Sequence, residues 1–99
     1  MMEFEFSIWL LQHGFSRKLS SDYVSRLKRI ERSLSNCDID GEFYKDNCKD
    51  LLSIFKNSGK NEKMASRLIS DLPIGKYYIS TYKYAVKKYV DFMNDFTNL

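Results

Sequence analysis

The most regular pattern in the sequence is an apolar stripe close to its carboxyl end. From Ser80 to Phe96, large apolar side chains recur every three or four residues, which is the period of an amphipathic α-helix. The stripe consists of Tyr82, Ala85, Val86, Tyr89, Phe92 and Met93. A helix of this kind is stable in water only when another surface covers its apolar face. We therefore expect the other segments to pack around it.

Four other segments carry helical patterns of their own. We predict helices from Glu3 to His13, from Ser20 or Ser21 to Leu34, from Phe43 or Asp46 to Asn57, and over Met64 to Leu72. No alternating strand pattern extends beyond a few residues. The sequence therefore predicts an all-α, compact bundle of four to five helices. It should form a single domain spanning residues 1–99, with the last helix packed against the first two.

The first two predicted helices should be buried to different extents. The first carries Phe4, Ile8 and Leu11 beside its Phe6 and Leu10 face, so we expect it to be well buried over most of its circumference. Gly14 fits the left-handed position that ends such a helix. The second helix has one narrow stripe, which consists of Tyr23, Leu27, Ile30 and Leu34, and Ser20 or Ser21 should cap its first turn.

The net charge of +3 is small, but the charges are distributed unevenly along the chain. Between Ser16 and Ser35, six basic residues stand against two acidic ones. Between Asn36 and Ser53 the balance reverses, with five acidic residues against two lysines. One helix is therefore basic and the segment after it acidic, and this local contrast says more about partners than the total charge does.

Cysteine usage and the amino-terminal segment favour a cytoplasmic protein. Cys37 and Cys48 do not form a CxxC motif, so two reduced thiols are the favoured interpretation and a disulfide is the alternative. The first apolar run is short and carries Glu3 and Glu5 where a signal peptide carries lysine or arginine. No segment approaches the roughly 18 apolar residues of a membrane span. We therefore expect no membrane contact.

Candidate reaction centres are missing from the sequence. It contains no glycine-rich phosphate loop, no histidine and cysteine set at metal spacing, and no nucleophile with an evident base. The single histidine, His13, fits the last turn of the first helix, where the helix dipole favours it. We therefore expect no catalysis, no cofactor and no metal ion.

The segment from Asn36 to Asn47 superficially resembles a calcium loop. With Gly41 at the sixth loop position, Asn36, Asp38 and Asp40 fall at the first, third and fifth positions. The twelfth position is then Asn47, where a calcium loop has a bidentate glutamate. We therefore favour a turn at Asp40–Gly41, with Asp38 or Asp40 capping the next helix.

Two basic helix faces are the best candidates for a functional surface. Lysine and arginine side chains on one face neutralise phosphates, and each such contact adds to a salt-dependent affinity. The candidate DNA-binding residues are Arg26, Lys28, Arg29 and Arg32 of the second helix and Lys83 and Lys87 of the last helix. The alternative is that these faces are simply solvated. Tyr77, Tyr78 and Tyr84 likewise either stack on bases or belong to a protein interface.

Two stretches together resemble a known family. GFSRKLSSDYVSRLKRIERSL follows the first predicted helix, and YYISTYKYAVKKYVDFM lies near the end of the chain. They are similar to the N-terminal core-binding, SAM-like domain of phage-type integrases, the tyrosine recombinases. The last helix of that domain often reads Tyr-x-x-Ala-Leu-x-x-Tyr-x-x-Phe. Here the pattern falls on Tyr82, Ala85, Val86, Tyr89 and Phe92.

The resemblance implies a SAM-like helical bundle that grips duplex DNA. The catalytic domain of that family, with its tyrosine nucleophile, is absent from these residues, so no tyrosine here is assigned that role. The chain would be the N-terminal module of a larger protein, or a module that has lost its catalytic partner. Our leading hypothesis is a non-catalytic DNA-binding module of a recombinase-like or integrase-like protein. The alternative is a protein-interaction or oligomerisation module that acts through the aromatic C-terminal helix, with no role in DNA binding.

Overall fold

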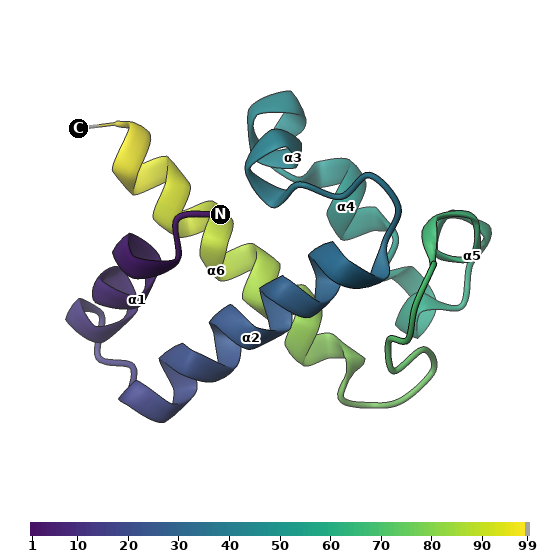
Figure 1. Ribbon diagram of the computed structural model, residues 1–99, viewed down its shortest axis with the longest axis horizontal. Helices are drawn as coiled ribbons and strands as arrows, with labels where there is room; N and C mark the ends of the chain where they lie inside the picture. Colours follow the sequence, from purple (N-terminus) through teal and green to yellow (C-terminus); the bar gives the residue numbers. More distant parts are fainter. Residues whose placement is uncertain (99) are drawn as a thin grey trace.

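The fold is an all-α bundle, as the sequence predicts. A computed structural model describes residues 1–98 (Figure 1). In order, its elements are α1 (Glu3–Gln12), α2 (Arg17–Ser33), α3 (Ile39–Asp46), α4 (Lys49–Ser53), the short 3-10 turn η1 (Lys56–Gly59), α5 (Glu62–Arg67) and α6 (Ile79–Thr97). Within residues 1–98, the only pairing of β type is an isolated bridge between Leu34 and Leu68.

Helix α6 lies at the centre of the bundle. Its predicted stripe is confirmed, because Tyr82, Ala85, Val86, Tyr89, Phe92 and Met93 are all buried. In Figure 1, α2 crosses the middle of α6, and α1 lies beside its C-terminal half. The ring of Phe6 on α1 lies 5.0 Å from that of Tyr89 and 5.4 Å from that of Phe92, centre to centre. The predicted packing of the last helix against the first two is therefore confirmed.

Helix α1 is less buried than the sequence predicts. Phe6 and Leu10 are buried, whereas Phe4 is 73% exposed. The prediction of burial around most of the helix is wrong because α1 has its main neighbours, α2 and α6, on one side only. The predicted glycine stop is confirmed. Gly14 has a φ of 88°, and the Phe15 N–H donates to the Leu10 carbonyl at 3.0 Å.

Helix α2 begins about one turn earlier than predicted. Ser16, rather than Ser20 or Ser21, is its N-cap, and the Ser16 hydroxyl accepts a hydrogen bond from the Leu19 N–H at 3.1 Å. Ser20 is buried and donates its own hydroxyl to the Ser16 carbonyl. The predicted stripe is nevertheless confirmed, since Tyr23, Leu27, Ile30 and Leu34 are all buried.

The predicted third helix is divided into α3 and α4. Asn47 and Cys48 both adopt left-handed backbone conformations, with φ values of 58° and 62°, which end α3 and redirect the chain before α4. The predicted turn at Asp40–Gly41 is wrong, because both residues lie inside α3. Asp38 does occupy the N-cap position of α3, although its side chain makes no capping hydrogen bond.

Helix α5 ends before its predicted stripe does. It stops at Arg67, and the chain then runs beside the end of α2. There the Ile69 N–H donates to the Ser33 carbonyl and the Ser35 N–H donates to the Arg67 carbonyl, each at 2.8 Å. These bonds replace those of a further helical turn. As a result Ile69 is exposed, whereas Leu72 still reaches the core.

The hydroxyl of Tyr89 joins α6 to α3 and to the first residues of the chain. The buried Tyr89 donates to Asp40 Oδ1 at 2.5 Å and accepts the Met2 N–H at 2.8 Å. The same carboxylate lies 3.3 Å from the Met1 amino group. Burial, together with the hydrogen bond to Asp40, raises the pKa of Tyr89 well above its usual value. The hydroxyl therefore remains a donor at neutral pH.

We predict that Tyr89→Phe lowers the free energy of unfolding by about 1–2 kcal/mol, because it removes the donor to Asp40 Oδ1 and the acceptor of the Met2 N–H. Urea unfolding followed by circular dichroism measures the change. Tyr44→Phe removes a hydroxyl from an exposed ring on α3 and is the matched control, expected to shift stability by less than about 0.5 kcal/mol. Equal unfolding midpoints for the two variants would contradict the prediction.

Candidate nucleic-acid interface

Two of the four predicted DNA contacts on α2 are engaged within the protein. Lys28 Nζ lies 2.9 Å from Glu3 Oε1 on α1. Arg29 Nη1 donates to the Tyr82 hydroxyl at 2.7 Å. Its Nε donates to the Asp71 carbonyl oxygen at 3.1 Å, and its Nη2 lies 3.4 Å from the Asp71 carboxylate. Arg29 therefore connects α2 with α6 and with the segment that precedes α6.

Arg26 and Arg32 form no ion pair within residues 1–98. The Arg26 guanidinium lies 5.8 Å from the centre of the Tyr23 ring, a cation–π contact that uses none of its N–H groups. Arg26 also lines a groove between α2 and α6, together with Ser80 and Tyr84. Arg32 is exposed on the outer side of α2. Both guanidinium groups are thus available to an external anion.

Lys83 and Lys87 lie one turn apart on α6. Lys83 lines a hollow between α6 and η1, together with Lys56, Tyr77 and Ser80. Each residue of an α-helix turns the chain by about 100°, so Lys83 and its neighbour Tyr84 line hollows on two sides of α6. Ser80 borders both hollows. Of the six predicted residues, only Arg26 and Lys83 therefore line hollows beside the first turns of α6, and they do so from two sides.

We call the residues around these two hollows the α6 N-terminal surface. The residues that we include from the linings are Arg26, Lys56, Tyr77, Ser80, Lys83 and Tyr84, and we add Lys76, which lines neither hollow but lies in the turn directly before α6. The four basic side chains of this set form no ion pair within the described part of the chain. Helix α6 begins here with no acidic residue in its first turn and no capping side chain. The positive end of its dipole therefore adds to the charge of the side chains.

This arrangement suits a polyanion. Flanking lysines compensate the phosphate charge, whereas the first-turn N–H groups of Ile79 and Thr81 already donate to the Lys76 and Tyr78 carbonyls at 3.1 and 3.0 Å. The Ser80 hydroxyl lies between the two hollows and donates its single proton to the Tyr77 carbonyl at 3.2 Å, so it would have to rotate away from that carbonyl to donate to a phosphate. Tyr77 is 90% exposed and presents a flat ring on which a sugar or an unpaired base can stack.

Two residues of the α6 N-terminal surface, Lys56 and Lys76, are absent from the sequence prediction. Lys56 belongs to η1, and Lys76 lies in the turn that precedes α6. The chain reverses after Lys56 through Asn57, Ser58 and Gly59, all of which have positive φ. Lys56 falls within the helix predicted up to Asn57, but apolar periodicity marks only the buried residues of that helix. Lys76 lies on no predicted helix, and its only local signal is its position beside Tyr77 and Tyr78, which precede α6.

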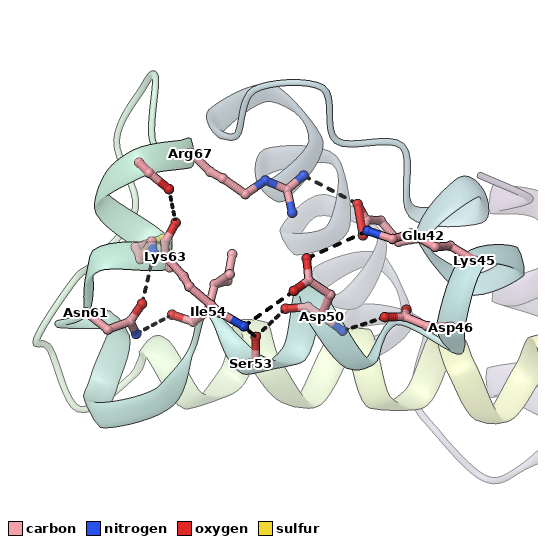
Figure 2. Close-up of polar contacts among 11 residues, drawn as sticks. Glu42, Lys45, Asp46, Asp50, Ser53, Ile54, Asn61, Lys63 and Arg67 are labelled. Atoms are coloured by element: carbon pink, nitrogen blue, oxygen red, sulfur yellow. Dashed lines mark hydrogen bonds and ion pairs between the residues drawn. The ribbon is translucent and has the colours of Figure 1, made fainter.

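The acidic segment that follows α2 is compensated by its own neighbours (Figure 2). Arg67 Nη2 on α5 lies 3.4 Å from Glu42 Oε2 on α3. The Asp50 carboxylate lies 3.5 Å from Lys63 Nζ and 3.9 Å from Lys45 Nζ. Within residues 1–98, none of the six predicted DNA contacts pairs with this segment. These ion pairs of the acidic segment therefore lie within the α3–α5 region and do not involve the basic surface.

The two thiols are poorly suited to nucleophilic chemistry. Cys37 and Cys48 are free, and burial raises the pKa of Cys37 to about 11 and that of Cys48 to about 12. The reactive thiolate is therefore scarce at neutral pH. Among residues 1–98, no three His, Cys, Asp or Glu side chains gather as ligands for a metal ion. The helices of the same residues also lack the length and apolarity needed to cross a bilayer.

We predict that part of the stability at alkaline pH depends on Cys48. Its pKa rises from 9.0 to about 12 on folding, so its contribution is complete below pH 9 and is lost as the pH rises toward 12. Urea unfolding measures the free energy of unfolding at about pH 8 and about pH 10.5. Its decrease between these two pH values should be smaller in Cys48→Ala than in the wild type by about 1–2 kcal/mol. An identical loss in the wild type and the variant would refute this assignment.

Comparison of the chain with protein-family models, with curated proteins and with solved structures gives no match.

Proposed function

We propose that this domain is a non-catalytic DNA-binding module that grips the backbone of duplex DNA through the α6 N-terminal surface. One observation carries the proposal. Arg26 of α2, Lys56 of η1 and Lys83 of α6 converge on the start of α6 without an acidic partner in the described chain. The resemblance to the core-binding domain of tyrosine recombinases supports the same function, because it rests on the two helices that supply Arg26 and Lys83.

The surface is suited to phosphates more than to base edges. Lys56, Lys76 and Lys83 carry flexible point charges without the fixed geometry that base recognition needs. Arg26 alone on this surface has a planar fork that can enter a groove and reach guanine. We therefore expect binding with little sequence preference and with dissociation constants of about 10⁻⁴ to 10⁻⁶ M at physiological salt.

The predicted residues contribute unequally to this proposal. Arg26 and Lys83 lie on the surface, and Lys87 extends it by one turn along α6. Lys28 pairs with Glu3 of α1, and Arg29 pairs with Asp71 and donates to Tyr82 of α6. Replacing either residue should therefore affect stability as well as DNA binding. Variants at these two positions are therefore unsuitable tests of DNA binding.

We predict that the double variant Lys56→Gln, Lys83→Gln weakens DNA binding and flattens its salt dependence. Each phosphate contact contributes about 0.9 to the slope of log affinity against log salt, so two lost contacts should reduce the slope by about 2. The measurement is fluorescence anisotropy of a labelled duplex of about 20 base pairs, titrated with the intact chain between about 50 and 200 mM salt.

The matched control is Arg17→Gln, Lys49→Gln, which removes the same charge from exposed basic residues that form no ion pair within residues 1–98 and lie outside the α6 N-terminal surface. It should keep most of the wild-type slope. Equal effects of the two double variants would mean that only the net charge matters, and the assigned surface would be wrong. If the wild-type protein does not bind duplex DNA at low salt, or binds it with an affinity that does not depend on salt, the proposed DNA-binding function is wrong.

A protein-interaction or oligomerisation role without DNA binding is the competing function. It is favoured by the exposed apolar residues on α1 and at the end of α6, such as Phe4 and Phe96. Sedimentation over a wide concentration range distinguishes the two. A strict monomer that binds duplex DNA agrees with our proposal, whereas a dimer that ignores DNA agrees with the competitor.

A further inference from the structure

A groove lies between α1 and the last turns of α6, at the opposite end of α6 from the basic surface. Phe4, Ile8 and Trp9 form its α1 wall, and Phe92 and Phe96 form its α6 wall. Its volume is about 450 Å³. About 15 residues of α6 separate Ser80 from Asp95 at this end, which corresponds to roughly 22 Å along the helix. The groove is therefore distinct from the α6 N-terminal surface.

The walls of the groove are two apolar rows, and all their members except the buried Phe92 are partly exposed. Phe4 and Ile8 are one helical turn apart, and Phe92 and Phe96 repeat the same spacing, with ring centres 5.7 Å apart. Phe4 is 73% exposed, Ile8 39% and Phe96 40%. Side chains in such rows interlock with apolar residues three and four positions apart on another helix. The groove therefore has the shape that receives a helix.

A carboxylate from each wall borders the apolar groove. Glu5 belongs to α1, and Asp95 belongs to α6, where its Oδ2 accepts the Trp9 indole N–H at 2.9 Å. Neither carboxylate forms an ion pair within residues 1–98. The groove is thus locally acidic on a chain whose net charge is +3. Complementary charge on the occupant requires lysine or arginine beside its apolar stripe.

We propose that this groove docks a basic amphipathic α-helix of a partner protein. The apolar stripe of that helix packs on Phe4, Ile8 and Phe96, and its lysines or arginines face Glu5 and Asp95. From Phe4 to His13, the α1 wall is about 14 Å long, so two to three turns of the partner fill it. An interface of this size is small, and we expect affinity in the micromolar range. This role is independent of DNA binding and compatible with it.

The single tryptophan provides a direct test, because Trp9 lines the groove. The probes are two synthetic peptides of about 14 residues with leucine at helical spacing. One has lysine at the remaining positions and the other has glutamate. The lysine peptide should change Trp9 fluorescence in a saturable manner, and the glutamate peptide should bind at least about tenfold more weakly. Glu5→Lys should reduce or reverse this preference.

Two exposed aromatic residues supply matched variants. Phe4→Ala removes part of the groove wall and should lower the affinity for the lysine peptide about tenfold. Tyr44→Ala on α3 should leave this affinity unchanged. Circular dichroism of both variants checks that the helices are retained. Equal binding of the two peptides, or an unchanged affinity in Phe4→Ala, would overturn the proposal. Concentration-dependent dimerisation that Phe4→Ala abolishes would also overturn it and assign the groove to a second copy of this chain.

Discussion

The burial of one apolar stripe on α6 determines where the other helices of this domain lie. Phe6 of α1 packs on Tyr89 and Phe92 in the C-terminal half of α6, and α2 crosses the middle of α6. Each large apolar side chain that is fully buried contributes about 1.5–3 kcal/mol, so the stripe outweighs any single polar contact. Hydrogen bonds such as the one from Arg29 to Tyr82 then fix the orientation of helices that already pack on the stripe.

Because α6 is the axis of the bundle, its two ends acquire different chemistry. The beginning of the helix projects past α2 and is flanked by Arg26, Lys56 and Lys83. The other end borders the exposed side of α1 and is apolar and acidic, with Phe96 and Asp95. A helix of 19 residues separates them. The two proposed ligands, which carry opposite charge, would therefore contact different side chains of one small domain.

Features that follow from the apolar periodicity are predictable from the sequence. Features that depend on which backbone conformation or hydrogen bond the tertiary fold favours are not. The stripes of α2 and α6 are predictable, and so are Arg26 and Lys83, since each lies at a known angle from a stripe. The break at Asn47 requires a left-handed conformation that asparagine tolerates but does not impose. The end of α5 depends on the bonds between Ile69 and the end of α2, and Lys56 approaches α6 only through the tertiary fold.

The contact between Phe6 and Tyr89 joins residues near the two ends of the sequence. While the chain is being synthesised, α1 and α2 are complete long before α6 leaves the ribosome. Until then Phe6, Leu10 and Leu27 have no stripe to cover, and the nascent chain exposes the residues that later form its core. The domain therefore cannot complete its core until α6 has been synthesised, and chaperones that bind apolar segments have their best opportunity in that interval.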